Sequence, residues 1–410
     1  MLVSIAAILY RFPSRKLKVI GITGTNGKST VVEMVSAILE EAGYKIAISS
    51  SIKFKLGKIV WRNESRMTMP GKFFLQKLLR NAVSQNCQYA VIEVSSEGIK
   101  QHRHRFINFN TVIITNVTPE HIESHGSFDK YLKTKGELFR VNQNIHIINF
   151  DDSNSKYFIN FPSKKKYIYG INVTNNNNQD GGIMITRASY PQISPAGTTF
   201  RIDDVEFNLK LLGKYNIYNA LAAISLGLSQ RIDLNICKNA LNKIITMPGR
   251  MDEIISHPFK VFVDYAVTPD SLEKAYQTIK DIFKGSRMVC VLGSCGGGRD
   301  KWKRPILGKL AKHYCDYVII TNEDPYDENP SDIINEIAKN DEKTIKILDR
   351  RNAISEALKS AKKDDIIIIT GKGCESSMCV NGGIRIPWDE KQVVIEEFTK
   401  LFDNNSAQIT

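Results

Sequence analysis

The segment from Lys18 to Thr30 (KVIGITGTNGKST) constrains the fold of this chain more than any other stretch. A short apolar run, typical of a buried β-strand, ends in Gly, Thr and Asn, and apolar residues at helical spacing follow. This order of strand, Gly-rich loop and helix is that of a phosphate-binding loop. Gly24 and Gly27 let backbone N–H groups approach phosphate oxygens, Lys28 adds a positive charge, and the Ser29 hydroxyl is a ligand that Mg²⁺ accepts.

The loop has the shorter G-T-N-G-K-S form, because Ile22 occupies the position, five residues before Gly27, where the longer pattern requires Gly. The alternative interpretation is a Gly-rich turn before an ordinary helix, with no ligand. We predict that the loop binds a nucleoside triphosphate.

A length of 410 residues is enough for two domains, since a single core rarely grows beyond about 250 to 300 residues. The spacing of apolar residues changes after the Pro-Gly break in Met247-Pro248-Gly249-Arg250. We therefore place the domains at 1–248 and 249–410. The net charge of +13 raises the question of nucleic-acid binding. However, Lys and Arg are scattered and no basic run carries interleaved aromatic residues, so an anionic small substrate explains the charge as well.

The seven cysteines form no CxxC pair and no Cys/His cluster at zinc spacing, which predicts free thiols and a cytoplasmic protein. The apolar run from Leu2 to Tyr10 is far shorter than the roughly 20 residues of a membrane span. We expect it to be a packed first helix, the alternative being a weak contact with a membrane surface.

In the first domain, two buried strands deliver polar residues at their ends. The run Tyr89–Val94 is apolar except for Glu93, and Thr111–Asn116 leads into a loop with His121 and His125. Carboxyl ends of parallel strands are where such folds place ligands. Lys135 lies beside apolar helix positions. A snorkelling lysine, whose amine reaches solvent, fits this pattern as well as a functional lysine does. From the pattern alone, the two histidines either bind a metal or cap the helix.

Residues 151–201 appear poor in strands, with an Asn tract at 175–178 and glycines at 181–182, and we expect an exposed hairpin or loop there. After Met251, strands and helices alternate, which predicts a second doubly wound α/β unit. Polar and charged residues suited to binding or catalysis again follow the strands, at Asp264, 293–300, 323–325 and 371–375. Because this happens at four strands, we expect these residues to form a site that faces the first domain.

These motifs together resemble the Mur ligase family, over roughly residues 18–400 and in matching order. They include the phosphate loop, Glu93-Val94-Ser95-Ser96 with Gln101-His102-Arg103, the T-N-x-x-P-E-H-I-E-x-H-G stretch from Thr115, Tyr131-x-x-x-Lys135, Tyr215–Ala223, Pro248–Met251, Asp264-Tyr265-Ala266, Gly296–Pro305 and Gly371-Lys372-Gly373. Within the family, the chain is most similar to the tripeptide synthetases of peptidoglycan synthesis (MurE type). The resemblance implies a P-loop central domain with a mainly parallel sheet and a Rossmann-like C-terminal domain.

The resemblance also implies ATP-dependent amide-bond formation with Mg²⁺. A substrate carboxylate attacks the γ-phosphate of ATP, and the amine of an amino acid then displaces phosphate from the acyl phosphate. The acceptor is UDP-N-acetylmuramoyl-L-alanyl-D-glutamate or a related muramoyl peptide. No nucleic acid and no stable membrane insertion are expected.

The site residues that the resemblance implies fall into three groups. Catalysis and metal binding involve Lys28, Ser29, Glu93, His121 and a carbamoylated Lys135. ATP binding involves Gly24, Thr25, Asn26, Gly27, Lys28, Ser29, Thr30, Asn219, Arg250 and Asp264. Substrate binding involves Thr68, Ser95, Gln101, Arg103, Arg304, Glu323, Asp324, Gly371 and Glu375.

The chain departs from the family pattern in several places. Only some twenty residues precede the phosphate loop, whereas the family carries an N-terminal uridine-binding domain, so we expect a partner to supply it, weak binding, or a substrate without the nucleotide. Tyr326 follows Glu323-Asp324-Pro325 where diaminopimelate-specific members have Arg, and the acidic residues favour a cationic amino acid such as lysine or ornithine. Val267 and Cys374 each replace a His, and we expect activity to survive both changes.

Two other functions compete with this interpretation. The first is a folylpolyglutamate synthase or a poly-amino-acid ligase of the same fold, but the intact Ser95, Gln101 and Arg103 pattern favours the muramoyl type. The second is a non-catalytic ATP-binding subunit of a cell-wall complex. This alternative predicts that motif residues such as Lys28 or Glu93 are replaced by other residues, and neither is.

Overall fold

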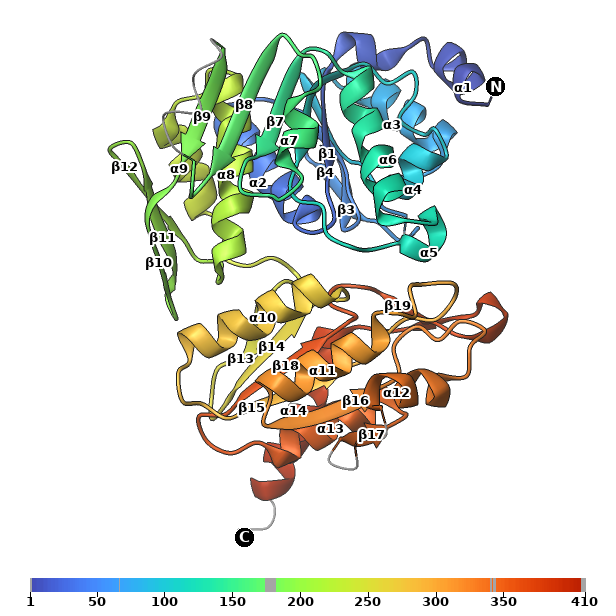
Figure 1. Ribbon diagram of the computed structural model, residues 1–410, viewed down its shortest axis with the longest axis vertical. Coiled ribbons are helices and arrows are strands. Elements are labelled where there is room, and N and C mark those ends of the chain that lie inside the picture. Colours follow the sequence, from blue (N-terminus) through green and yellow to red (C-terminus); the bar gives the residue numbers. More distant parts are fainter. Residues whose placement is uncertain (1, 66, 174–181, 340, 342–343, 407–410) are drawn as a thin grey trace. The chain divides into compact units, whose positions relative to one another are not determined.

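The computed structural model describes residues 2–65, 67–173, 182–339, 341 and 344–406. The chain divides into two compact units (Figure 1). Unit 1 comprises Met1–Pro119 and His125–Ile245, and unit 2 comprises Glu120–Ser124 and Thr246–Thr410. Both units combine mostly parallel sheets with helices, which confirms the predicted α/β class.

Unit 1 is built on a nine-stranded sheet of order β4-β3-β2-β5-β1-β6-β7-β8-β9. Its strands are β1 (Lys18–Thr23), β2 (Ile46–Ser49), β3 (Lys53–Leu56), β4 (Ile59–Arg62), β5 (Tyr89–Glu93), β6 (Phe109–Ile114), β7 (Ile145–Asn149), β8 (Lys165–Gly170) and β9 (Ile183–Arg187). Strand β1 pairs in parallel with β5 and β6, so the phosphate loop and the end of β5 lie at the same sheet edge. Only the β2–β3 and β3–β4 pairs are antiparallel in this sheet as described.

Helices cover both faces of this sheet. The described helices of unit 1 are α1 (Leu2–Leu9), the 3-10 helix η1 (Pro13–Lys16), α2 (Lys28–Glu41), α3 (Lys72–Ser84), α4 (Ser96–Lys100), α6 (Phe128–Val141), α7 (Ser155–Ile159), α8 (Lys214–Ser229) and α9 (Leu234–Asn242), while α5 (Ile122–His125) contains residues of both units. Helices α3, α6 and α7 share one core with alternate strand residues such as Val19 and Ile92. The intervening residues, such as Ile20 and Val91, are also buried and face the opposite side, where α2 and α8 contact the strands.

The prediction that residues 151–201 are poor in strands is wrong, although the exposed hairpin expected as one alternative is present at residues 189–202. Strands β8 and β9 extend the main sheet, and β10 (Ser189–Ser194), β11 (Gly197–Ile202) and β12 (Val205–Leu209) form a separate three-stranded antiparallel sheet. The Asn tract at 175–178 and Gly181 lie outside the described residues. The stacked rings of Phe200 and Phe207, 5.2 Å apart, show that this small sheet has a buried apolar face of its own.

Unit 2 is a six-stranded sheet of order β13-β14-β18-β15-β16-β17, parallel except for the β13–β14 pair. Its strands are β13 (Asp252–Ile255), β14 (Lys260–Asp264), β15 (Met288–Leu292), β16 (Tyr317–Thr321), β17 (Ile345–Ile347) and β18 (Ile366–Thr370), with a β19 (Ser377–Cys379) and β20 (Arg385–Pro387) hairpin beside them. Its helices are α10 (Pro269–Ile282), α11 (Arg304–Tyr314), α12 (Pro330–Ala338), α13 (Arg350–Ser360), the 3-10 helix η3 (Asn381–Gly383) and α14 (Glu390–Ser406). The doubly wound pattern expected from the sequence is therefore present.

All seven cysteines are described and none forms a disulfide, in agreement with the expected free thiols. Among the described helices, none is both long and apolar enough to cross a membrane.

Two buried histidines make the stability of unit 1 sensitive to acid. His104 and His146 are at most 3% exposed, and burial lowers the pKa of each to about 4. The unfolded chain, with a His pKa of about 6.5, therefore binds more protons than the native state between pH 6.5 and 4. The stabilising contribution is complete above pH 6.5 and is lost as the pH falls, by about 2 kcal/mol per histidine at pH 5.

We expect His146→Gln to remove about 2 kcal/mol of the difference in unfolding free energy between pH 7 and pH 5. Urea unfolding of both proteins at the two pH values measures this. His313→Gln, at an exposed position, is the matched control and should leave the difference unchanged. An acid sensitivity that His146→Gln preserves in full would contradict the prediction.

Candidate active site

The phosphate loop requires glycine at two positions. Gly24 and Gly27 have φ angles of 150° and 83°, which disfavour other residues. A Cβ atom on Gly24 would lie 1.9 Å from Thr115 Oγ1, and one on Gly27 would lie 2.4 Å from Asn219 Oδ1. The backbone of the loop is thus packed directly against two polar side chains, one of them Asn219 of α8.

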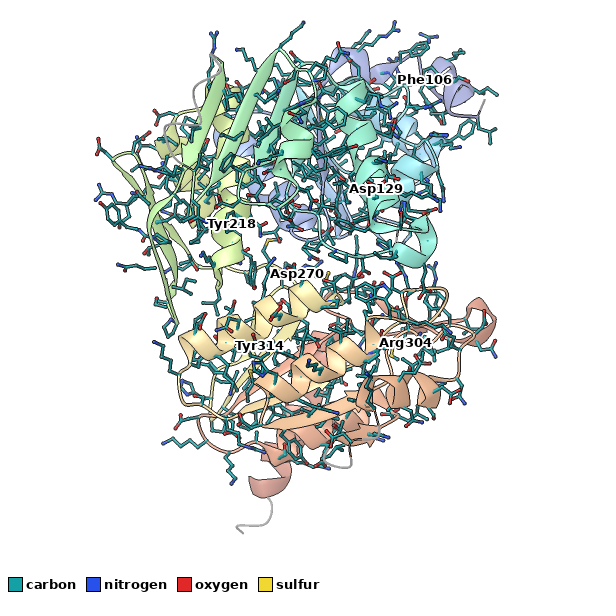
Figure 2. The ribbon with its side chains drawn as sticks, viewed as in Figure 1. Phe106, Asp129, Tyr218, Asp270, Arg304 and Tyr314 are labelled. Carbon is teal, nitrogen blue, oxygen red and sulfur yellow. The ribbon has the colours of Figure 1, made fainter. Side chains whose placement is uncertain are left out.

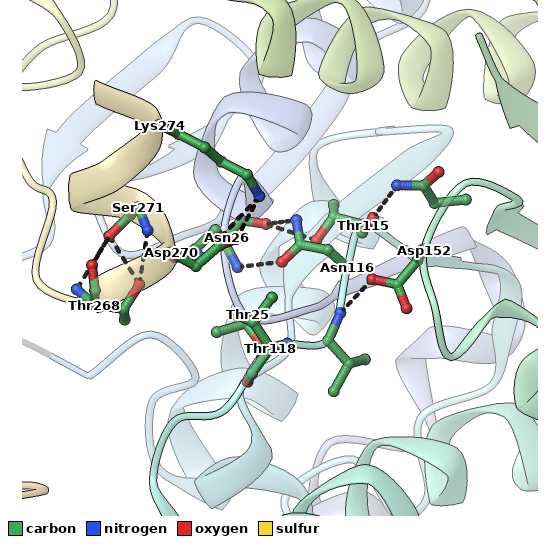
Figure 3. Close-up of polar contacts among 12 residues, drawn as sticks. Thr25, Asn26, Thr115, Asn116, Thr118, Asp152, Thr268, Asp270, Ser271 and Lys274 are labelled. Atoms are coloured by element: carbon green, nitrogen blue, oxygen red, sulfur yellow. Dashed lines mark hydrogen bonds and ion pairs between the residues drawn. The ribbon is translucent and has the colours of Figure 1, made fainter. Parts of the chain in front are cut away.

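Residues after β6 hold the loop in place (Figure 3). Thr115 Oγ1 donates to the Asn26 carbonyl (2.7 Å), and the Asn26 N–H donates to Asn116 Oδ1 (3.0 Å). Thr25 Oγ1 donates to the Thr118 carbonyl at 3.2 Å. Helix α2 starts at Lys28, directly after the loop, so the loop leads into a helix N-terminus of the kind that binds anions.

Glu93, at the end of β5, meets the start of α2. Its carboxylate is 1% exposed and accepts hydrogen bonds from Ser29 Oγ (3.1 Å), the Ser51 N–H (2.8 Å) and Ser51 Oγ (3.0 Å). Thr68 joins this network through Ser51 Oγ at 2.9 Å. Ser29 and Glu93 therefore form a pair of oxygen donors beside the phosphate loop, and Thr30, next along α2, is buried.

Two lysines converge on carbonyls of the loop. Lys28 Nζ donates to the Thr25 carbonyl (2.9 Å) and Lys135 Nζ donates to the Gly24 carbonyl (2.8 Å). Lys135 is 1% exposed and lies 4.6 Å from the centre of the Tyr131 ring. Burial, together with the positive charge of Lys28, holds the pKa of Lys135 well below its usual range. A snorkelling lysine, which would reach solvent, is excluded.

The predicted acceptor residues gather around α4. Ser95 caps this helix by accepting from the Gly98 N–H (3.1 Å), and Arg103 Nε donates to Gln101 Oε1 (3.0 Å). The Arg103 guanidinium also donates to the Met69 carbonyl, next to Thr68. His125, by contrast, is buried between Ser96 and Thr134 hydroxyls, so the interpretation as a structural residue fits it.

His121 belongs to a short segment, Glu120–Ser124, that is held within unit 2. Asp300 accepts hydrogen bonds from the Ile122 N–H (3.2 Å) and the Glu123 N–H (2.9 Å). Lys303 Nζ lies 3.0 Å from Glu120 Oε1, and both side chains are nearly buried. Asp300 is thus a positioning residue for the backbone beside His121.

We expect Asp300→Asn to loosen this segment, because an amide NH₂ would face one of the two N–H donors. Leaving one donor unsatisfied costs about 1 to 3 kcal/mol, or roughly a 5- to 150-fold faster amide exchange at Ile122 and Glu123. Hydrogen exchange with mass spectrometry measures it. Asp270→Asn, at a half-buried position in the first turn of α10, is the control, and unchanged exchange in Asp300→Asn would contradict the assignment.

The strand ends of unit 2 carry the remaining predicted residues. Asp264 ends β14 and accepts from the Met251 N–H (2.7 Å), and burial raises its pKa to about 6, although the charge of Arg250 opposes that shift. The Arg250 guanidinium lies 4.5 Å from the centre of the Tyr265 ring. Asp264 and Arg250 therefore lie close enough together for their charges to interact.

Beyond β16 and β18, acidic and basic side chains form one network. Lys372 Nζ contacts Asp324 Oδ1 (2.9 Å) and Glu375 Oε2 (2.5 Å), while Glu323 accepts from Cys295 Sγ (2.8 Å). A Cβ atom on Gly371 would lie 2.6 Å from Glu323 Oε2, so Gly371 is needed for this approach. Arg304 is fully buried and paired with Glu328 and Glu336. The structure brings Glu323, Asp324, Gly371 and Glu375 together, while Arg304 binds a neighbouring acidic pair.

The sequence interpretation did not assign roles to Ser51, Asp300 or Cys295. Ser51 and Cys295 bind the predicted site residues Glu93 and Glu323, and Asp300 binds backbone N–H groups beside His121. For Asp300, its place in the polar run after β15 was the one available signal. Within the described residues, no group of three or more His, Cys, Asp or Glu side chains is arranged to hold a metal ion.

Comparison with known proteins agrees with this architecture. The model of the Mur ligase middle domain matches residues 22–227, and that of the Mur ligase, glutamate ligase domain, matches residues 249–373. The UDP-N-acetylmuramoyl-L-alanyl-D-glutamate--2,6-diaminopimelate ligase of Syntrophomonas wolfei is 35% identical over 96% of this chain and 80% of its own length. Ligase 1 of the same name from Clostridium acetobutylicum is 38% identical over 97% of this chain and 81% of its own length.

Solved structures give the same result for the fold. A structure of a UDP-N-acetylmuramoyl-L-alanyl-D-glutamate--2,6-diaminopimelate ligase has a TM-score of 0.62 and 26% identity, covering 94% of this chain and 79% of its own. A folylpolyglutamate synthase from Mycobacterium tuberculosis has a TM-score of 0.68 over 90% of this chain and 91% of its own, but at 17% identity it shows only a shared fold. By the match of both domain models and the identity to these relatives, the chain belongs to the Mur ligase family.

Proposed function

We propose that this protein is an ATP-dependent ligase that joins an amino acid to UDP-N-acetylmuramoyl-L-alanyl-D-glutamate, or to a related muramoyl peptide, in peptidoglycan synthesis. The observation that carries the proposal is the cluster at the phosphate loop, where Lys28, Lys135 and the Ser29–Glu93 pair meet within unit 1. Relatives that are 35% and 38% identical carry the name of such a ligase. The division into a central domain, 1–248, and a C-terminal domain, 249–410, is part of the proposal.

The reaction divides into two steps. The carboxylate of the acceptor attacks the γ-phosphorus of ATP, and ADP leaves, giving an acyl phosphate. The amino group of the amino acid then attacks the acyl carbon, phosphate leaves, and the nitrogen loses a proton. The first step brings two anions together, and the second releases phosphate, so fixed positive charge and orientation are the main requirements.

The residues of unit 1 suit these requirements. The N-terminus of α2, the glycine-lined loop and Lys28 offer donors and positive charge to the triphosphate. Ser29 and Glu93 are hard oxygen donors 3.1 Å apart, a set that fits one Mg²⁺. His121, which belongs to unit 2, is the candidate ligand of a second Mg²⁺. When bound, Mg²⁺ neutralises phosphate charge. Arg103, Ser95, Gln101 and Thr68 are the candidates for binding the acceptor.

The amino-acid site is proposed in unit 2, at the network of Glu323, Asp324 and Glu375. Its acidic character favours a substrate with a second amine, which diaminopimelate, lysine and ornithine share. Tyr326 takes the position of the arginine expected in diaminopimelate-specific enzymes, so the distal carboxylate of diaminopimelate lacks that partner. The cytoplasmic location remains a prediction.

The test is phosphate release from ATP by the purified protein with UDP-N-acetylmuramoyl-L-Ala-D-Glu and, one at a time, meso-diaminopimelate, lysine and ornithine. Release that depends on both substrates, with the tripeptide product seen by mass spectrometry, supports the proposal and names the amino acid. ATP binding without release in any of the three mixtures contradicts the proposed acceptor or amino acids. The Lys28→Met protein is the blank for contaminating ATPases.

A further inference from the structure

The first helix carries an apolar face that the rest of the described chain leaves uncovered. Leu2, Ile5, Ile8 and Leu9 are 57%, 44%, 63% and 64% exposed. Helical spacing places these four aliphatic side chains on one side of α1. The opposite side, with Val3, Ala6 and Ala7, is buried, and α1 contacts α3. The helix is therefore fixed to unit 1 by its small residues and presents its large ones outward.

A further exposed apolar side chain lies close to η1, the 3-10 helix that follows α1. Phe106, labelled in Figure 2, is 50% exposed and belongs to the turn before β6. Ser14 of η1 fixes that turn, because its hydroxyl accepts from the Asn108 N–H (3.0 Å) and donates to the Phe106 carbonyl (3.5 Å). Since η1 starts four residues after α1 ends, the exposed aromatic ring belongs to the same part of unit 1.

The charges around this face are of one sign. No Asp or Glu occurs in residues 1–32 or in α3. Arg11, Arg15, Lys16 and Arg105 are exposed beside the apolar residues. Arg15 and Lys16 also line, with Lys18, a cavity of about 470 Å³. Helix α3, which contacts both α1 and η1, adds Lys72, Lys77 and Arg80.

We propose that this α1 surface, consisting of Leu2, Ile5, Ile8, Leu9, Phe106, Arg11, Arg15, Lys16 and Arg105, docks on an anionic lipid bilayer. Aliphatic and aromatic side chains flanked by cations are the composition of an interfacial helix, whose apolar face enters the boundary between head groups and acyl chains. Each Lys or Arg near such a surface adds attraction to anionic head groups. The absence of acidic residues in these segments favours lipid phosphates over a protein partner of mixed charge.

The docking is peripheral. Helix α1 has eight residues, so it extends about 12 Å, well short of the hydrocarbon core. The helix is also anchored by its buried side to α3, so it can lie along a membrane while unit 1 stays folded. The binding should accordingly be reversible and weakened by salt, because exposed charges are screened within about 10 Å at 0.1 M ionic strength.

The test is co-sedimentation of the 410-residue protein with vesicles of phosphatidylcholine alone or with 30% phosphatidylglycerol. One variant carries Arg11→Glu, Arg15→Glu and Lys16→Glu, and a second carries Leu2→Gln, Ile5→Gln, Ile8→Gln and Leu9→Gln. The control for the first variant carries Lys164→Glu, Lys165→Glu and Lys210→Glu. The control for the second carries Met184→Gln, Ile245→Gln, Ile384→Gln and Ile386→Gln. All seven positions are exposed or half-exposed and lie elsewhere in the chain. Thermal melting and ATP binding show that each variant is folded.

We expect binding to the anionic vesicles only, about a hundredfold weaker in the charge-reversal variant. The glutamine variant should bind at least tenfold more weakly, and both controls should bind like the wild type. Equal binding by the first variant and its control would overturn the proposal, as would failure of the wild type to bind anionic vesicles. Dimerisation in light scattering that the glutamine variant abolishes, without vesicle binding, would assign the surface to a second copy of the chain and also overturn it.

Discussion

Replacing Lys28 by Met is expected to slow substrate-dependent phosphate release by about a thousandfold, the upper range for loss of one preorganised charged donor. Lys28 starts α2, and its ammonium group already lies 2.9 Å from the Thr25 carbonyl, at the phosphate loop. Methionine keeps the length and most of the packing of the side chain but removes the charge. The loss should therefore appear in the chemical step more than in folding.

Single-turnover phosphate release and calorimetric titration with ATP separate these effects. We expect the thermal midpoint of Lys28→Met to stay close to that of the wild type, while ATP affinity falls and the rate collapses. Lys130→Met, at an exposed position of α6, is the matched control and should leave rate and affinity unchanged. A Lys28→Met rate within threefold of the wild type would remove this lysine from the proposed mechanism.

Much of the fold could be predicted because its central strands are buried on both faces. Strands β14, β15 and β16 read in the sequence as continuous apolar runs, and the structure has them at the predicted residues. The polar residues that follow such runs must lie at one sheet edge, so the candidate site residues could be grouped before their contacts were known.

The remaining features depend on contacts between distant residues. Strand β8 begins with two lysines and pairs with β7 and β9, and nothing in its own composition specifies those neighbours. Ser51 binds Glu93 across 42 positions, and Asp300 binds the Glu123 N–H across 177. Backbone donors carry no residue-type signal, so sequence patterns could not identify the second contact.

The environment of Lys135 bears on the carbamoylation that the family resemblance implies. Burial and the charge of Lys28 both favour the neutral amine, and the neutral amine is the form that attacks CO₂. The new N–C bond gives a carbamate and releases a proton, so a neutral amine next to Lys28 would become a negative group. Because the pKa of Lys135 is lowered, the reactive neutral form is more abundant at neutral pH than in an exposed lysine, and it decreases as the pH falls.

We expect Lys135→Arg to lose the carbamate and to slow phosphate release by about a hundredfold or more, since arginine keeps a positive charge and does not react with CO₂. In ¹³C-bicarbonate buffer, the wild type should show a carbamate resonance that Lys135→Arg lacks. Lys133→Arg, two residues earlier in α6 and 65% exposed, is the control and should change neither signal nor rate. Lys135→Met should melt no lower than the wild type, because it removes a buried amine whose charged form is costly. A carbamate resonance that persists in Lys135→Arg, or full activity of that variant, would show that Lys135 acts as an unmodified structural amine.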